Sequence, residues 1–174
     1  VEMMLDATQN FKDPLTKKRL LGWHAALFPT GFSGMTQITV GVFRDDKNGP
    51  MQVVSGPMGR ERVHFEAPSA KLINKEMAKF LDWFNRKIAI DDVLKAAVAH
   101  LWFVTVHPFD DGNGRIARAI GDMLLARSEN SAQRFYSLSA QIRQERAAYY
   151  EMLEKTQKAA LDITNWLEWF LTCL

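Results

Sequence analysis

A short segment in the second half of the chain combines side chains that bind a polyphosphate with one that can move a proton. It reads His-Pro-Phe-Asp-Asp-Gly-Asn-Gly-Arg-Ile-Ala-Arg and spans residues 107–118. Gly112 and Gly114 let the backbone approach an anion without the strain of a Cβ atom, and the N–H groups that open the following helix converge on the same point. These features predict a turn that accommodates phosphate oxygens.

Charged and amide side chains surround this turn. Arg115 and Arg118 are three residues apart on a predicted helix, so both guanidinium groups project from one face and can hold successive phosphates. Asn113 can donate an amide hydrogen bond to a charge-bearing oxygen. A hard cation such as Mg²⁺ needs an oxygen ligand beside the phosphates, and the carboxylate of Asp110 or Asp111 offers one. The segment therefore predicts a site for a polyphosphate with its metal.

His107 ends a predicted buried helix and is followed by Pro108. An imidazole has an ordinary pKa of about 6.5, which suits proton abstraction near neutral pH. We therefore predict that His107 is a general base. Phe109 is a large apolar ring among polar neighbours, so we expect it to point into the core and anchor the loop.

The segment resembles the Fic family motif HxFx(D/E)GNGRxxR at every specified position. The matching residues are His107, Phe109, Asp111, Gly112, Asn113, Gly114, Arg115 and Arg118. The resemblance implies a protein adenylyltransferase with ATP as substrate and Mg²⁺ as cofactor. His107 would deprotonate a Ser, Thr or Tyr hydroxyl of a target protein, which attacks the α-phosphate of ATP as pyrophosphate leaves. It further implies that Asp111 holds the Mg²⁺, and that Arg115 and Arg118 hold the β- and γ-phosphate regions.

The resemblance extends on both sides of the motif. The runs GVFRDD, MQVVSG and RVHFEAPS are similar to the family's flap, a β-hairpin over the active site that docks the target by strand addition. It places four residues in the docking flap: Val53, Val54, Val63 and His64. Tyr149 and Tyr150, followed by Leu153, and the ending DITNWLEWFL are similar to the family's C-terminal helices. We assign Tyr149 and Tyr150 to the nucleotide pocket, with core packing as an equal alternative.

Other activities of this fold stay open. Members that phosphorylate their targets carry lysine at the second glycine of GNGR, and Gly114 argues against that reaction. Another nucleotide or phosphate-containing donor is compatible with the loop, because the distal group is read elsewhere. A non-catalytic nucleotide-binding regulatory module is the alternative from another class, although binding alone does not need His107.

Regulation is expected to come from outside these residues. Thr164 to Glu168 superficially resembles the family's inhibitory motif (S/T)xxxE(G/N), but Trp169 occupies the last position, so we interpret Glu168 as an ordinary helix residue. An inhibitory segment or an antitoxin partner is therefore expected outside this chain. Removal of AMP, which needs that glutamate, stays open. The chain opens at Val1 without methionine, which is typical of a mature product or of a fragment of a longer protein, and we expect a fragment that lacks its N-terminal part.

Hydrophobic periodicity predicts a mainly α fold, and the resemblance makes it a Fic-type helical bundle with a small β-hairpin flap, as one domain over residues 1–174. Helices are expected over Asp13–Phe28, Lys71–Arg86, from Asp91 to Pro108, and over Arg115–Arg127, Ser139–Ala159 and Thr164–Leu171. Strands are expected over Gln37–Phe43, Met51–Ser55 and Arg62–Glu66.

Composition excludes several classes of protein. A hydrophobic share of 47% supports one sizeable core, and a net charge of +2 indicates neither disorder nor a nucleic-acid partner. No membrane span or secretory signal is present, so a cytoplasmic location is the default. Zinc-type spacings are absent. Cys173 and His100 are expected in the core, and a homo-oligomer is compatible with the sequence.

Overall fold

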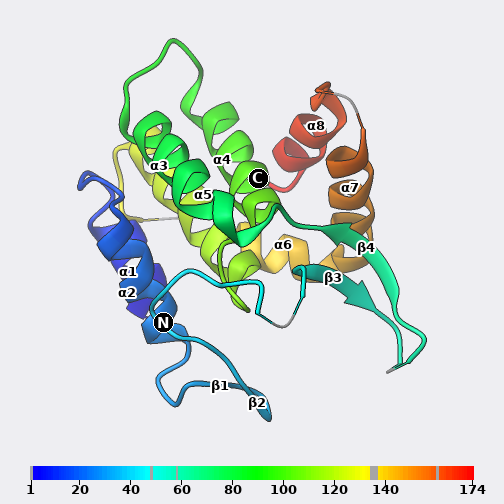
Figure 1. Ribbon diagram of the computed structural model, residues 1–174. Coiled ribbons are helices and arrows are strands. Elements are labelled where there is room, and N and C mark those ends of the chain that lie inside the picture. Colours follow the sequence, from blue (N-terminus) through cyan, green and yellow to red (C-terminus); the bar gives the residue numbers. More distant parts are fainter. Residues whose placement is uncertain (1, 48, 58, 134–136, 160) are drawn as a thin grey trace.

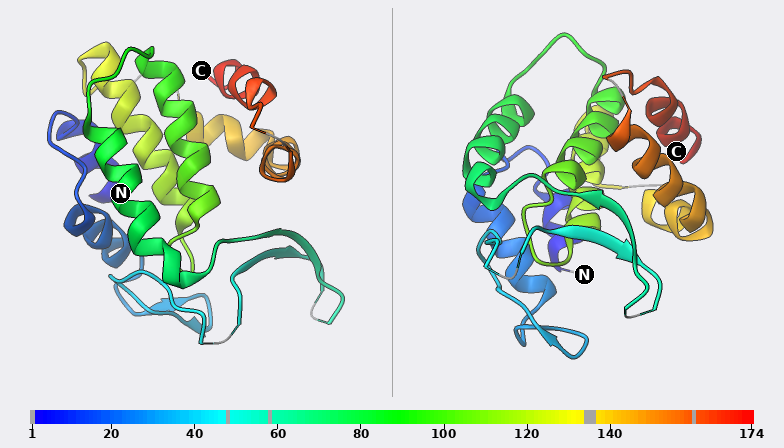
Figure 2. Two further views of the ribbon diagram at one scale, coloured as in Figure 1. Left: turned by 45° about the horizontal axis from the view of Figure 1, so that its top comes forward. Right: turned by 45° about the vertical axis from the view of Figure 1, so that its right-hand side comes forward.

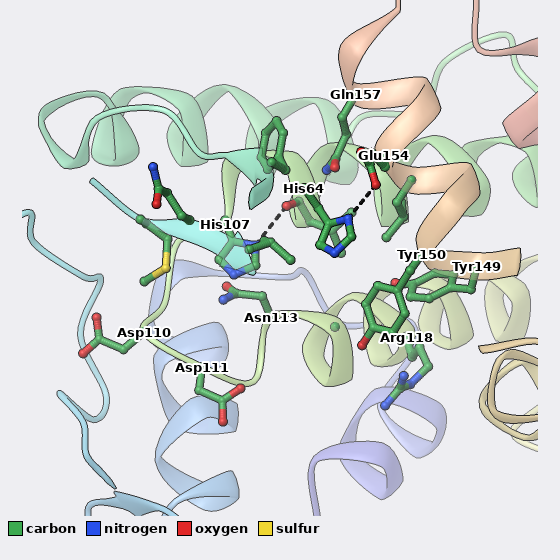
Figure 3. Close-up of a pocket in the computed structure, with 17 residues that line it drawn as sticks. His64, His107, Asp110, Asp111, Asn113, Arg118, Tyr149, Tyr150, Glu154 and Gln157 are labelled. Atoms are coloured by element: carbon green, nitrogen blue, oxygen red, sulfur yellow. Dashed lines mark hydrogen bonds and ion pairs between the residues drawn. The ribbon is translucent and has the colours of Figure 1, made fainter. Parts of the chain in front are cut away.

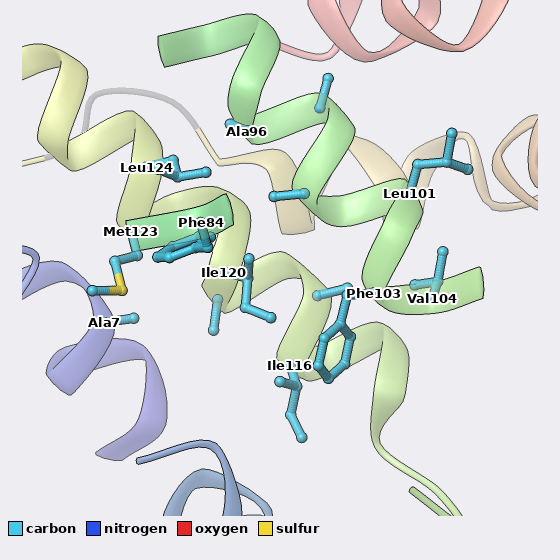
Figure 4. Close-up of a cluster of buried hydrophobic side chains, with 14 of the residues drawn as sticks. Ala7, Phe84, Ala96, Leu101, Phe103, Val104, Ile116, Ile120, Met123 and Leu124 are labelled. Carbon is cyan, nitrogen blue, oxygen red and sulfur yellow. The ribbon is translucent and has the colours of Figure 1, made fainter. Parts of the chain in front are cut away.

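The computed structural model describes residues 2–47, 49–57, 59–133, 137–159 and 161–174 (Figure 1). Two helices form its centre: α4 (Asp92–Val106) and α5 (Asn113–Glu129). Residues 107–112 join them and are called the motif loop below. Buried side chains of both helices meet there, with Phe103 and Ile116 both fully buried (Figure 4). The expectation of a mainly helical bundle with a small hairpin is confirmed.

Local signals in the sequence explain where α4 and α5 begin and end. The carboxylate of Asp91 caps α4 by accepting hydrogen bonds from the backbone of Val93 and Leu94. His107 ends α4 in the left-handed conformation, with φ of 50°, and Pro108 follows. Gly112, with φ of 82°, precedes α5, and Asn130 closes it, again left-handed. Both helices match the expected ranges within a few residues.

The remaining helices flank this central pair. In Figures 1 and 2, α1 and α2 lie on one side and α7 and α8 on the other. Their bounds are α1 Glu2–Gln9, α2 Lys17–Leu27, α3 Ala70–Asn85, α6 Leu138–Gln144, α7 Arg146–Lys158 and α8 Thr164–Thr172. No helix in the described ranges is both long and apolar enough to cross a bilayer.

These helices differ from the sequence prediction in three ways. Helix α1 was not anticipated. Helix α2 begins at Lys17 and not at Asp13, because the hydroxyl of Thr16 caps it by accepting from the backbone of Arg19. The helix expected over Ser139–Ala159 is two helices that meet at Glu145, where φ is −102° and ψ is 33°.

The prediction of a strand over Gln37–Phe43 is wrong. Only β1 (Phe32–Ser33) and β2 (Thr36–Gln37) pair in this region. Beyond Gln37 the backbone forms no strand ladder. Thr39 N donates to Asp110 and Gly41 N donates to His24. Ile38 N and Arg44 N donate to the carbonyl oxygens of Gly31 and Pro108. Alternating hydrophobicity therefore marks a segment that packs on the motif loop.

The second hairpin is the expected flap. Strands β3 (Gln52–Ser55) and β4 (Arg62–Glu66) pair antiparallel, with Val53 opposite Phe65 and Val54 opposite Val63, and a bulge lies between the two pairs. Figure 2 shows this hairpin as an arm that extends from the base of α3 toward α7.

Candidate active site

A cavity of about 290 Å³ lies between the flap, the motif loop and α7 (Figure 3). Each of the three segments contributes a wall. The lining residues that carry polar or ionisable side chains are Gln52, His64, His107, Asp110, Asp111, Asn113, Arg118, Tyr149, Tyr150, Glu154 and Gln157. The structure thus gathers most of the predicted site residues around one space.

His107 lies at the end of α4 and its ring faces this cavity. Its Nδ1 lies 3.2 Å from the carbonyl oxygen of Val104. A carbonyl can only accept, so the proton belongs on Nδ1 and the lone pair on Nε2. Burial lowers the pKa of His107 below its ordinary value of 6.5, against the opposing effect of the Val104 carbonyl. The ring is therefore neutral near pH 7 and can accept a proton at Nε2.

Asn113 holds the loop closed. Its Oδ1 accepts from Phe109 N at 3.0 Å, and its Nδ2 donates to Phe109 O at 2.8 Å. Phe109 is fully buried, as expected, and its ring stacks on His24 with centroids 4.1 Å apart. The double bond to Phe109 was not anticipated from the sequence. A further role of Asn113 toward a bound oxygen stays a prediction.

Gly112 and Gly114 serve different purposes. A Cβ atom on Gly112 would lie 2.9 Å from the ring of Phe28, and its φ is positive. Nothing lies within 4 Å of the corresponding position on Gly114, which lines the cavity. Gly112 is therefore needed by the fold, whereas the space beside Gly114 is open to a bound group.

The two arginines do not lie together as predicted. Arg118 lines the cavity and makes no hydrogen bond or ion pair with any residue that the structure describes. Arg115 does not line the cavity, and its guanidinium lies 4.6 Å from the centre of the Phe28 ring and 3.5 Å from Asp111. Arg118 is thus the cation available in the cavity.

Asp111 is the carboxylate that best fits a magnesium ion. No group of three His, Cys, Asp or Glu side chains within the described ranges could hold a metal by itself. Magnesium commonly uses one or two carboxylates together with substrate phosphates. The Asp111 side chain is 46% exposed, accepts from Ser33 Oγ and lies beside Gly114 in the cavity wall. Asp110 also lines the cavity, but one of its oxygens accepts from Thr39 N at 2.9 Å.

Only part of the predicted flap set faces the cavity. Val53 and His64 line it, together with Met51, Gln52 and Phe65, which the prediction did not include. Val54 and Val63 do not line it and are 47% and 44% exposed. These two side chains lie in the half of the hairpin nearest its tip.

Helix α7 supplies the third wall. Tyr149 is buried and its hydroxyl lies 2.9 Å from Nε2 of His100, whereas Tyr150 is 47% exposed. Both tyrosines line the cavity, and their assignment to the nucleotide pocket stays a prediction. Sequence reasoning missed Glu154 and Gln157, although Tyr150, Glu154 and Gln157 follow one another at helical spacing on one face.

The other expectations concern residues outside the cavity. His100 is fully buried, and burial lowers its pKa to about 3. Cys173 is buried as predicted, and burial raises the pKa of its thiol to about 11. Glu168 is exposed on α8 and does not line the cavity, in agreement with its interpretation as an ordinary helix residue.

Comparison with known families and proteins gives concordant results. The model of the Fic/DOC family matches residues 14–125. Similar curated proteins include protein adenylyltransferase fic-1 of Caenorhabditis briggsae, 38% identical over 66 residues, which are 37% of this chain and 13% of that protein. Protein adenylyltransferase Fic of Drosophila willistoni is 32% identical over 99 residues, 56% of this chain and 18% of its own length. The chain thus spans less than a fifth of these relatives.

Solved structures agree in fold. A Fic family protein from Desulfovibrio desulfuricans matches 96% of this chain and 47% of its own, with a TM-score of 0.72 and 25% identity. A Fic-domain signaling protein from Bacteroides thetaiotaomicron matches 99% of this chain and 63% of its own, with a TM-score of 0.72 and 23% identity.

Proposed function

Because the chain belongs to the Fic/DOC family, we propose that it transfers AMP from ATP to a Ser, Thr or Tyr hydroxyl of a target protein. The observation that carries this proposal is the imidazole of His107, which is fixed through Nδ1 and lines the same cavity as Gly114 and Arg118. A pocket that only bound nucleotide would need the glycine and the arginine but not an oriented base.

The base would act on the acceptor. Nε2 of His107 takes the proton of the acceptor hydroxyl while the hydroxyl oxygen forms a bond to the α-phosphorus of ATP. The bond between that phosphorus and the bridging oxygen to the β-phosphate breaks, and pyrophosphate leaves. Because Val104 already holds Nδ1, the ring does not need to reorient before it accepts the proton.

The phosphates would occupy the open side of the loop. The first backbone N–H groups of a helix have no partner within it, so those that open α5 would be donors for phosphate oxygens in the space beside Gly114. Arg118 can bind the terminal phosphate, and Asp111 can hold Mg²⁺ against the phosphate oxygens. A bound magnesium ion would neutralise part of the charge that develops on the leaving group. Arg115 reaches the phosphates only after it leaves Phe28.

The acceptor would approach from the flap side. Strands β3 and β4 form an isolated two-stranded sheet, so each has an unpaired edge that an extended segment of the target can join. An inhibitory segment or antitoxin partner outside this chain stays a prediction.

Labelled ATP tests the proposal. A lysate incubated with the chain, magnesium and ATP should gain label from the α-phosphate but not from the γ-phosphate, and mass spectrometry should find an added adenylyl group. His107→Ala should lower labelling at least about 100-fold while ATP affinity changes little. Label from the γ-phosphate alone would show phosphoryl transfer instead. ATP binding without labelling by the unaltered chain would indicate a regulatory module.

A further inference from the structure

Glu154 on α7 joins the flap to the helical body. Its carboxylate receives three cationic or polar donors: Lys158 at 2.7 Å, Arg62 at 2.9 Å and Nδ1 of His64 at 2.5 Å. Arg62 and His64 belong to β4, whereas Lys158 lies one turn further along α7. Figure 3 shows the bond between His64 and Glu154 along the cavity wall.

The bonds of His64 continue across the hairpin. Its Nε2 lies 2.6 Å from Oγ of Ser55 on β3. The Ser55 hydroxyl can donate to a neutral ring or accept from a protonated one, while Nδ1–H donates to Glu154 in both states. Glu154 therefore holds both strands, directly through β4 and indirectly through Ser55.

Other anchors of the flap lie at its root. Arg44 is buried and donates to Pro68 O and to Asp46, and Asp46 accepts from Ala70 N at the start of α3. Ala67 N donates to Met51 O. All of these bonds lie on the body side of the strands, so they fix where the arm starts but not where it points.

Glu154 is also well placed to act on the cavity. Its side chain is 15% exposed and lines the cavity together with His64. Hydrogen bonds from Lys158 and His64, followed by Arg62, lower its pKa to about 2. The carboxylate is thus charged near neutral pH, so its bonds there do not depend on the loss or gain of its proton.

We infer that Glu154 is a positioning residue, which fixes the flap against α7 and so sets where a docked acceptor places its hydroxyl relative to His107. The inference rests on the proposed AMP transfer for its kinetic consequence, but the contact between flap and α7 can be tested without any activity. Glu154 touches neither the acceptor nor the transferred phosphate in this role.

Hydrogen exchange of the 174-residue chain without ligand tests the contact. Glu154→Gln keeps the size of the side chain and removes its charge. We expect the backbone amides of β3 and β4 to exchange about fivefold faster in this variant, with α4 and α5 unchanged. Glu151→Gln is the matched control, because Glu151 lies one turn earlier on α7 and, among the residues that the structure describes, forms an ion pair only with Lys155. Equal flap exchange in the two variants would overturn the inference.

Two substitutions of His64 test the same contact from the flap. Asn places its amide nitrogen near the position of Nδ1, whereas Gln places it near that of Nε2. His64→Asn should therefore keep the flap protected, and His64→Gln should expose it as Glu154→Gln does. If Glu154→Gln loosened α7 as a whole, the difference in flap exchange between the two His64 variants would still show whether the bond between His64 and Glu154 holds the flap. The same exchange in both His64 variants would count against the inference.

Kinetics with the acceptor identified by adenylyl mass gain test the consequence. Glu154→Gln should raise KM for the acceptor about fivefold and leave kcat and the affinity for magnesium–ATP within about twofold. His64→Asn should keep KM for the acceptor near that of the unaltered chain, whereas His64→Gln should raise it. A fall in kcat with unchanged KM would refute the positioning role. If the unaltered chain transferred no AMP, the proposed function would fail, while the exchange experiment would still decide whether Glu154 holds the flap.

Discussion

At the scale of single residues, His107 combines two opposed influences on one ring. The Val104 carbonyl favours a proton on Nδ1, while burial disfavours a second proton on Nε2. The result is an imidazole that stays available as a base to lower pH than a free histidine. This property belongs to the geometry at the end of α4 and not to histidine itself.

The pH dependence of transfer follows from this geometry. A lowered pKa means that the basic, neutral form persists below pH 6.5, so the acid limb of kcat/KM should lie at a pH below 6.5. The profile should be measured with the acceptor held well below KM. An acid limb above pH 6.5 would mean that another group, or a protonated His107, governs the reaction.

The residue types of the site were readable in the sequence, but their contacts were not. The spacing of the motif predicted the base, the carboxylate and the glycine turn. It could not predict that Asn113 bonds the backbone of Phe109, or that Arg115 lies on Phe28 from α2. The Asn113 bonds are local but depend on the exact turn of the loop. The Arg115 contact depends on which segment packs beside the loop, and that segment lies about 80 residues earlier in the chain.

At the scale of elements, the junction between the loop and α5 separates a folding requirement from a binding requirement. Gly112→Ala should destabilise the chain by roughly 1–3 kcal/mol, because its φ is positive and its Cβ would meet Phe28. Gly114→Ala should leave the unfolding free energy nearly unchanged and weaken ATP binding. Urea unfolding and ATP titration of both variants would check this. Equal stability of the two variants would contradict the assignment.

Elements with a strong period were predicted well, and those held by distant contacts were not. The stripe of Phe80 and Phe84 identified α3, and the apolar run after Asp91 identified α4. The alternation of Ile38, Val40 and Val42 suggested a strand, yet Gly41 adopts a φ of 71° and interrupts the extended backbone. Hydrophobic periodicity indicates which side chains are half-buried, but it does not identify the hydrogen-bond partners of the backbone.

At the scale of the whole molecule, buried histidines link folding to pH. His100 is fully buried, and its pKa of about 3 lies below the value of 6.5 that it regains on unfolding. The unfolded chain therefore binds more protons below pH 6.5, so stability falls as the pH falls from 6.5 toward 3. Burial lowers the pKa values of His24 and His107 as well, so these two residues also make stability fall as the pH falls.

His100→Gln should weaken this dependence. Gln can keep a donor near Tyr149 but cannot titrate. Between pH 7 and pH 5, the unaltered chain should lose roughly 2 kcal/mol more unfolding free energy than the variant, because carboxylates contribute equally to both. Urea unfolding at the two pH values measures the difference. Parallel losses would mean that His100 does not stay neutral in the folded chain.

The cavity draws its walls from three stretches of chain, and the third, α7, lies beyond residue 125, where the family match ends. A shortened polypeptide that stopped there would retain every letter of the motif and yet present an open trough, without Tyr149, Tyr150 or Glu154. The motif at residues 107–118 and the cavity wall formed by α7 thus lie in different parts of the sequence. Changes in α7 could alter which donor fits while the reactive loop stays the same.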